Sequence, residues 1–189
     1  MNKGIFKSLS DDAIVELIVK EQKPELYSIL FSRYHQKVLD KCYSMLKSRK
    51  LAEEFTEEIL SKAYEKLPGF KGMSSFSSWL YSITYNYCID YLRLKKKLHY
   101  PKWSSENEIP EIIDETEENL NEITYEKLLE ILEIIHPEEK ALLLMKYQDN
   151  LSMTQIGKSL RISDDAAKMR LKRARTRVIY LYKQKFLSK

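Results

Sequence analysis

Apolar residues recur at intervals of three and four along almost the whole chain, and this spacing constrains the fold more than any other feature of the sequence. Only four glycines and five prolines interrupt its 189 residues. Such a period places the apolar side chains on one face of a helix, and no strand or hairpin pattern is present. The sequence therefore predicts an all-α protein. A first helix capped near Ser10 should be followed by helices at about 24–46, 51–67, 76–97, 123–135 and 137–148, and then by a two-helix motif.

A change of pattern after position 100 indicates two small domains and not one. Every charged residue between Trp103 and Glu122 is acidic, and apolar periodicity does not return before Leu120. Because its acidic side chains keep such a segment extended and solvated, we expect an acidic flexible linker over 99–121. The predicted domains are 10–98 before this linker and 122–185 after it.

The sequence indicates neither a catalytic group nor a metal site. Cys42 and Cys88 lack metal-ligand spacing and the three histidines are scattered, so we expect two buried structural thiols. We accordingly expect no enzymatic activity, no metal and no cofactor. The first seven residues lack an apolar signal core, and the longest apolar run, 141–145, is too short to span a bilayer. These features favour a cytoplasmic protein with no membrane insertion.

The clearest motif lies in the last third of the chain, where residues 151–160 and 164–177 predict two helices joined by a tight turn. From Ala166 to the C-terminus every charged residue is basic. A helix-turn-helix with a cationic second helix is typical of proteins that read the DNA major groove, although a solvated amphipathic helix is the alternative. Side chains near the leading end of this helix are candidates for base contacts: Lys168, Met169 and Lys172. The arginines of this helix are expected either to bind phosphates or to fold back onto the protein: Arg170, Arg173, Arg175 and Arg177.

Two acids open this helix, Asp164 and Asp165. They suit the helix dipole, but they would meet DNA phosphates unfavourably. Either Ser163 or Asp164 is expected to cap the helix.

The predicted helix 76–97 combines aromatic residues with a cationic end, a composition that suits unpaired bases. The alternative is simple core packing, which helical spacing favours for Phe76, Leu80, Ile83 and Tyr87. A polar ribbon runs along one side of the same helix: Asn86, Asp90, Arg93 and Lys97. With the loop at 69–75, this ribbon would surround a small pocket able to accept an extruded base.

The predicted helix 51–67 presents four glutamates within little more than one turn: Glu53, Glu54, Glu57 and Glu58. Packed like charges repel one another unless water or a basic partner meets them. The sequence therefore leaves open a solvated surface and a face that binds another protein.

Taken together, these segments resemble the extracytoplasmic-function sigma factors, the two-domain promoter-specificity subunits of bacterial RNA polymerase. One segment resembles the family's core-polymerase-binding helix: Tyr34-His35, 51–58 and Ala63-Tyr64. A second resembles its promoter-melting and minus-10 segment: 70–72, Phe76, 79–81, Ile83, Asn86, Asp90 and 92–93. A third resembles its minus-35 reader: 151–152, Ile156, 162–163, Lys168, 170–171 and 173–175. The resemblance covers about positions 10 to 183.

The resemblance implies a factor that binds core RNA polymerase and directs promoter-specific transcription initiation. It assigns core binding to Glu53, Glu54, Glu57 and Glu58. It assigns minus-10 reading and melting to Phe70, Lys71, Gly72, Ser75, Trp79, Asn86, Asp90 and Arg93. It assigns minus-35 contacts to Lys168, Met169, Arg170, Lys172, Arg173 and Arg175. The implied partners are core RNA polymerase, promoter DNA and an anti-sigma factor.

The chain departs from the family pattern at several positions. Glu57 stands where a glutamine is usual, Tyr64 replaces a frequent tryptophan, and residues 164–167 replace the small residues that open the recognition helix. Arg161 replaces the glycine of the turn, which should strain a left-handed backbone slightly. The promoter sequence therefore does not transfer from the family. Two other classes fit parts of the sequence, namely a stand-alone helix-turn-helix regulator and a helical adaptor that leaves the basic helix unused.

Overall fold

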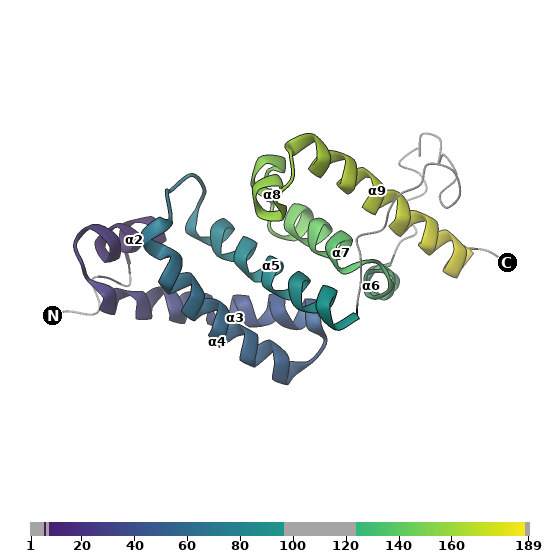
Figure 1. Cartoon of the computed structure of the whole chain (residues 1–189). Helices are drawn as coiled ribbons and strands as arrows, with labels where there is room; N and C mark the ends of the chain where they lie inside the picture. The colour runs from purple at the N-terminus through teal and green to yellow at the C-terminus, as the bar shows by residue number, and fades with distance from the viewer. Residues whose placement is uncertain (1–5, 7, 97–123, 188–189) are drawn as a thin grey trace. The chain divides into compact units, whose positions relative to one another are not determined.

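The computed structural model describes residue 6 and residues 8–96 and 124–187 (Figure 1). Its backbone contacts divide the chain into two compact units, Met1–Leu92 and Arg93–Lys189. Every regular element within the described ranges is a helix or a helical turn, so the predicted all-α class with two helical regions is confirmed. The predicted linker at 99–121 and Lys97 of the polar ribbon lie outside the described residues.

The first unit is a small bundle. Its described elements are α2 (Asp11–Lys20), η1 (Pro24–Leu26), α3 (Tyr27–Leu46), α4 (Arg49–Lys66), η2 (Leu67–Gly69) and α5 (Phe76–Lys96), whose residues from Arg93 onward are counted with the second unit (Figure 1). Ser10 caps α2 by accepting a hydrogen bond from the Ala13 N–H at 3.2 Å, as the sequence predicts. Pro24 opens a 3-10 turn that leads into α3, because its missing N–H is harmless in a first turn.

The core of this unit lies where α3, α4 and α5 meet. Its buried side chains include Leu30, Tyr34, Val38 and Cys42 from α3, Ala52, Phe55, Ile59 and Ala63 from α4, and Phe76, Leu80, Tyr85, Cys88 and Ile89 from α5. The inward face of α5 differs from the expected one, since Ile83 and Tyr87 are only half-buried while Thr84 and Tyr85 are buried. Thr84 tolerates burial because its hydroxyl donates to the Leu80 carbonyl at 2.9 Å.

The two cysteines are buried and free, in agreement with their predicted structural role. The Cys88 thiol donates to Cys42 across 3.9 Å. This hydrogen bond lowers the pKa of Cys42, and together with burial it raises the pKa of Cys88. The two thiols therefore contact each other where α3 packs against α5.

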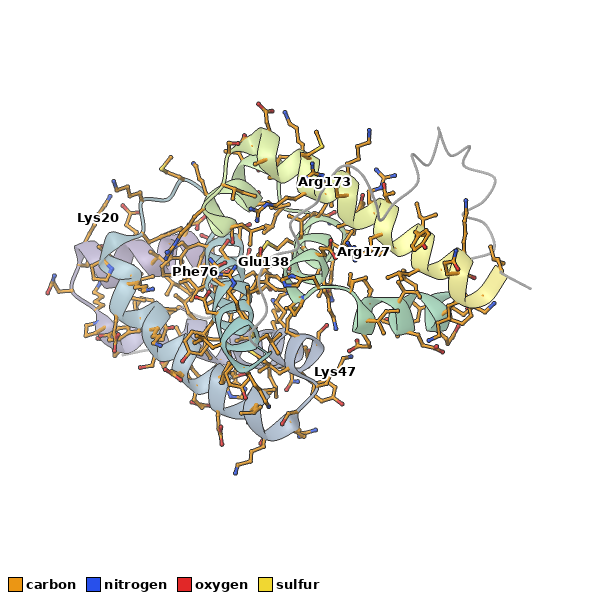
Figure 2. All side chains as sticks on the ribbon, turned by 45° about the vertical axis from the view of Figure 1, so that its right-hand side comes forward. Lys20, Lys47, Phe76, Glu138, Arg173 and Arg177 are labelled. Atoms are coloured by element: carbon orange, nitrogen blue, oxygen red, sulfur yellow. The ribbon has the colours of Figure 1, made fainter. Side chains whose placement is uncertain are left out.

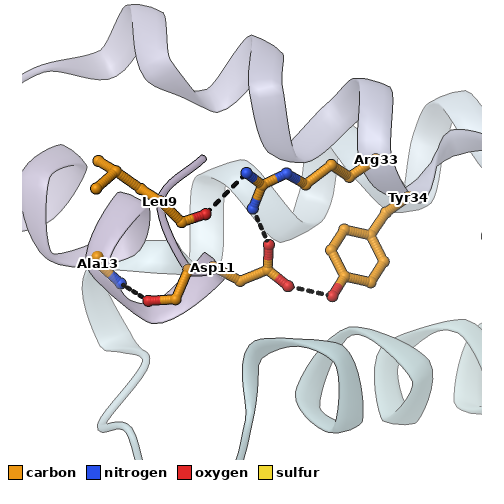
Figure 3. A network of polar contacts seen from close by, with 6 residues as sticks. Leu9, Asp11, Ala13, Arg33 and Tyr34 are labelled. Atoms are coloured by element: carbon orange, nitrogen blue, oxygen red, sulfur yellow. Dashed lines mark hydrogen bonds and ion pairs between the residues drawn. The ribbon is translucent and has the colours of Figure 1, made fainter. Parts of the chain in front are cut away.

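A polar network fastens the start of α2 to α3 (Figure 3). The Asp11 carboxylate accepts hydrogen bonds from Arg33 Nη1, at 2.5 Å, and from the Tyr34 hydroxyl. Arg33 Nη2 also donates to the Leu9 carbonyl at 2.8 Å. The Tyr34 ring packs edge-on against Phe76 at the start of α5, with centroids 5.2 Å apart. This network therefore connects three helices of the first unit.

The second unit comprises five described helical elements and a terminal turn. They are α6 (Tyr125–Ile134), α7 (Pro137–Leu143), η4 (Leu144–Gln148), α8 (Met153–Leu160), α9 (Asp164–Tyr182) and η5 (Lys183–Leu187). Helix α9 packs against α6, α7 and α8 (Figure 1). The expected helix 137–148 exists, but its last five residues widen into a π-helical turn in which the Asp149 N–H bonds to the Leu144 carbonyl at 3.1 Å.

Candidate nucleic-acid and polymerase interfaces

Helices α8 and α9 form the helix-turn-helix that the sequence predicts. Ser152 and Gln155 make a reciprocal capping box at the start of α8, and Ser163 caps α9 by accepting from the Ala166 N–H at 3.2 Å. Arg161 ends α8 in the left-handed conformation, with φ at 56°, as expected for the turn. The carbonyl of Gly157, in α8, accepts a hydrogen bond from the Ile162 N–H at 2.9 Å, and this bond closes the turn.

Five of the six residues assigned to minus-35 contacts are exposed on α9: Lys168, Met169, Lys172, Arg173 and Arg175. The opposite face of the helix is buried through Ala167, Leu171, Ala174 and Val178. The exposed residues therefore share the solvent side of the recognition helix. Arg170 differs, because it is half-buried and its Nη1 lies 3.3 Å from Glu138 Oε2 on α7.

Helix α7 supplies acidic partners that the sequence analysis missed. Glu138 pairs with Arg170, and Glu139 Oε1 lies 3.5 Å from Arg177 Nε; Figure 2 labels Glu138, Arg173 and Arg177. Burial raises the pKa of Glu139, while the Arg177 guanidinium and the His136 N–H lower it by less. Two arginines of the basic helix thus pair with acids inside the unit. Two adjacent acids following Pro137 were the only sequence signal for these pairs.

The two acids that open α9 have different environments. Asp164 is half-buried and accepts a hydrogen bond from the Thr154 hydroxyl of α8. Asp165 has a side chain that is 91% exposed, and its Oδ1 lies 3.1 Å from Lys168 Nζ. Asp164 therefore joins the two helices of the motif, whereas Asp165 faces solvent beside a predicted base-contacting residue.

The loop between η2 and α5 is held by an aromatic cluster. The Phe70 ring lies 5.1 Å from Trp79 and 6.4 Å from Phe76, measured between centroids. Gly72 has φ at +65°, a conformation that favours glycine. Ser75 caps α5 through a 3.2 Å hydrogen bond from the Ser78 N–H, so this predicted DNA-contacting residue also has a structural role.

The remaining predicted minus-10 residues occupy accessible positions. Lys71, Asp90 and Arg93 are exposed, and Asn86 is half-buried. Helical spacing places Asn86, Asp90 and Arg93 along one side of α5. Met73, which the sequence analysis did not select, is 72% exposed in the same loop. The structure thus places an exposed loop immediately before a helix with a polar side.

The four glutamates of α4 are all exposed. Glu53 pairs with Arg49 at 3.0 Å, Glu57 lies 2.9 Å from His35 Nε2, and Glu58 lies 2.9 Å from Lys62 Nζ. A hydrogen bond from Tyr87, followed by one from Lys62, lowers the pKa of Glu58. Because exposed ion pairs of this kind are weak, a basic partner can replace them at little cost.

None of the helices in the described ranges combines the length and apolarity needed to cross a bilayer. The same residues hold no cluster of three or more histidine, cysteine or acidic side chains arranged for a metal ion.

Comparisons with known proteins agree with this two-unit arrangement. Residues 30–98 match the family model "Sigma-70 region 2", and residues 125–178 match "Sigma-70, region 4". The chain is 28% identical over 172 residues to the ECF RNA polymerase sigma factor SigW of Bacillus subtilis (strain 168), a match that covers 83% of this chain and 89% of the relative.

Two solved structures have a similar fold. One is the sigma factor RpoE in complex with the anti-sigma factor NepR from Bartonella quintana, with a TM-score of 0.56 and 18% identity, covering 88% of this chain and 99% of that one. The other is CnrH in complex with the cytosolic domain of CnrY, with a TM-score of 0.61 and 14% identity. This match covers 92% of this chain and 98% of that one.

The two regions, in this order on one chain, define a promoter-specificity subunit of RNA polymerase. The chain belongs to the extracytoplasmic-function family of sigma factors. Members of this family are not enzymes. The presence of both regions favours a sigma factor over a stand-alone helix-turn-helix regulator, for which region 2 would have no use.

Proposed function

We propose that this protein binds core RNA polymerase and directs it to promoters through separate contacts at the minus-35 and minus-10 elements. The observation that carries the proposal is the pairing of a cationic recognition helix, α9, with a region 2 unit that has both an exposed acidic helix and an exposed loop before α5. A stand-alone regulator requires only the first of these features.

In the second unit, Lys168, Met169 and Lys172 are proposed to reach base edges in the major groove. Arg173 and Arg175 then bind phosphates, which position the helix without specifying sequence. Arg170 is proposed to act from its ion pair with Glu138, so its main contribution is to orient α9. The predicted domain 122–185 would thus carry minus-35 recognition.

In the first unit, the loop at 70–75 is proposed to capture a flipped base of the minus-10 element. Lys71, Gly72 and Met73 are exposed in this loop, while the Phe70 ring packs against Trp79 of α5. Asn86, Asp90 and Arg93 offer polar groups on the same helix. The predicted domain 10–98 would therefore combine DNA melting with core binding through α4, and the predicted linker 99–121 would join it to the second domain.

We further propose that the protein works in the cytoplasm, where polymerase and promoter DNA are found, and that it catalyses no reaction itself. An anti-sigma factor is a proposed partner. The support for it is the fold shared with the sigma factor RpoE, whose solved structure holds the anti-sigma factor NepR, and with CnrH, whose solved structure holds the cytosolic domain of CnrY.

Core binding is tested by reversing charge on α4. The double change Glu53→Lys and Glu54→Lys should abolish association with core polymerase, measured by native gel or sedimentation, and with it run-off transcription. Glu16→Lys on α2 is the matched control, because Glu16 is also exposed and also takes part in an i,i+4 ion pair, with Lys20 at 2.7 Å. Normal association of the double variant would reject the sigma-factor assignment of α4 and favour a stand-alone regulator.

Minus-35 recognition is tested by comparing two cations of α9 in the reconstituted holoenzyme. Lys168→Ala should relax base preference by about 1–3 kcal/mol at one position of the minus-35 element. Arg175→Ala should weaken all duplexes alike and reduce the slope of log affinity against log salt by about 0.9. If both substitutions change base preference in the same way, the division between base and phosphate contacts is wrong.

A further inference from the structure

The carboxylate of Asp165 occupies an unusual position for a DNA-binding helix. It is in the first turn of α9, its side chain is 91% exposed, and it precedes the predicted base-contacting residues Lys168 and Met169 by one turn. Its neighbour Asp164 is turned away and bonded to Thr154. The difference between these two acids means that only Asp165 presents a negative charge on the reading side of the motif.

Major-groove geometry limits what this carboxylate can contact. In helix-turn-helix proteins the first residues of the second helix approach the base edges most closely. An ionised carboxylate only accepts hydrogen bonds. In the major groove, cytosine offers its N4 amino group without an adjacent acceptor of its own, adenine places N7 beside its N6 amino group, and guanine and thymine present acceptors. Cytosine is therefore the base that an exposed aspartate favours most.

We propose that Asp165 is a specificity-determining residue that accepts a hydrogen bond from the N4 amino group of one cytosine in the minus-35 element. This inference rests on the proposed function and deepens it, because it names one base that the recognition helix selects. Asp165 also repels the N7 and O6 acceptors of a guanine at that position, so it discriminates by repulsion as well as by attraction.

The ion pair between Asp165 and Lys168 makes this role compatible with binding a polyanion. Lys168 Nζ lies 3.1 Å from Asp165 Oδ1 and offsets its charge as the helix approaches the phosphates. Both side chains are largely exposed, with 63% for Lys168, so the pair is weak and separates readily. Lys168 is then free to contact a neighbouring guanine or phosphate while Asp165 faces the cytosine.

An aspartate in a first turn also stabilises a helix through its dipole, which is the simpler role for this residue. That role predicts an effect on stability but none on base preference. Asp164 already supplies an acid in the same turn, and Ser163 already caps it. Base preference therefore separates the two roles.

The experiment uses holoenzyme reconstituted from core RNA polymerase and the full chain, with a promoter library randomised over the minus-35 element and read out by sequencing the transcripts. The wild-type protein is compared with Asp165→Ala, Asp165→Asn and Asp164→Asn. The last variant is the matched control, since it removes the same charge one residue away while keeping an acceptor for Thr154.

The wild-type holoenzyme should prefer cytosine at one position of the minus-35 element by about 5- to 150-fold. Asp165→Ala should abolish this preference while raising activity on other sequences, and Asp165→Asn should shift it towards adenine, whose N6 and N7 suit a carboxamide. Asp164→Asn should keep it. An absent preference, or an equal loss in Asp165→Ala and Asp164→Asn, would overturn the inference while leaving the sigma-factor function intact. A wild-type protein that directs no transcription would overturn both.

Discussion

Gly157 is the single glycine of the helix-turn-helix, and the substitution Gly157→Ala tests the geometry of its turn. A Cβ atom at this position would lie 2.9 Å from the Ile162 carbonyl oxygen and 3.2 Å from Asp164 Oδ1. The first of these atoms belongs to the backbone, so the turn itself has to move. The same turn is closed by the hydrogen bond from the Ile162 N–H to the Gly157 carbonyl.

Two effects of opposite sign decide the outcome. Alanine is a better helix former than glycine by about 0.8–1.0 kcal/mol. Forcing an additional methyl group into a packed site costs about 1–3 kcal/mol. Since the clash is with backbone and also strains the closing hydrogen bond, the upper part of this range applies. We expect a net loss of about 1–2 kcal/mol in the second unit.

Hydrogen–deuterium exchange of the full chain measures this loss locally. Amides in α8 and the first turns of α9 should exchange about 5–30 times faster in Gly157→Ala, and transcription that depends on the minus-35 element should fall. Gly69→Ala is the control, because a Cβ there meets no atom within 4 Å, and its effect should stay within about 0.5 kcal/mol. Unchanged or slower exchange in Gly157→Ala would show that helix propensity outweighs the contact and would refute the reasoning.

Three further predictions concern stability. Arg161→Gly should raise the stability of the second unit by about 0.5–1 kcal/mol, because it relieves a left-handed non-glycine residue at the expense of chain entropy; a lower thermal midpoint would contradict this. Burial raises the pKa of Glu139, so its ionised form opposes folding increasingly as pH rises above the ordinary range near 4.5. Glu139→Gln, which keeps an acceptor for the His136 N–H, should therefore raise the thermal midpoint at pH 7 more than at pH 4, and an equal effect at both would exclude the charge as the cause. Tyr34→Phe removes one donor to Asp11 and should cost about 1 kcal/mol in chemical denaturation, whereas no loss would show that water replaces the hydrogen bond.

Much of the fold was predictable because helices depend on local periodicity. The apolar stripe Leu30, Tyr34, Val38 and Cys42 is buried as its spacing predicts, and Ser10 and Ser163 cap the helices that follow them. The inward face of α5 was predicted less well. Hydrophobicity alone does not show that Thr84 can satisfy its hydroxyl within its own helix and replace Ile83 in the core.

The candidate sites were also predictable only in part. The exposed side of α9 follows from its alternation with Ala167, Leu171 and Ala174. Which of its charges remain available does not follow from sequence, because Arg170 pairs with Glu138, 32 residues away in the chain. A cation on a helix surface looks the same in sequence whether it faces an acid of another helix or solvent.

The sequence by itself determined the helical class of this protein, the helix-turn-helix and the family to which it belongs, since all three depend on local spacing and short-range order. Only the tertiary structure decided how the charges of the motif are used. It turned Asp164 towards Thr154, left Asp165 exposed, and paired Arg170 with α7. The physical reason is that electrostatic interactions depend on distance through space, and packing between helices sets those distances.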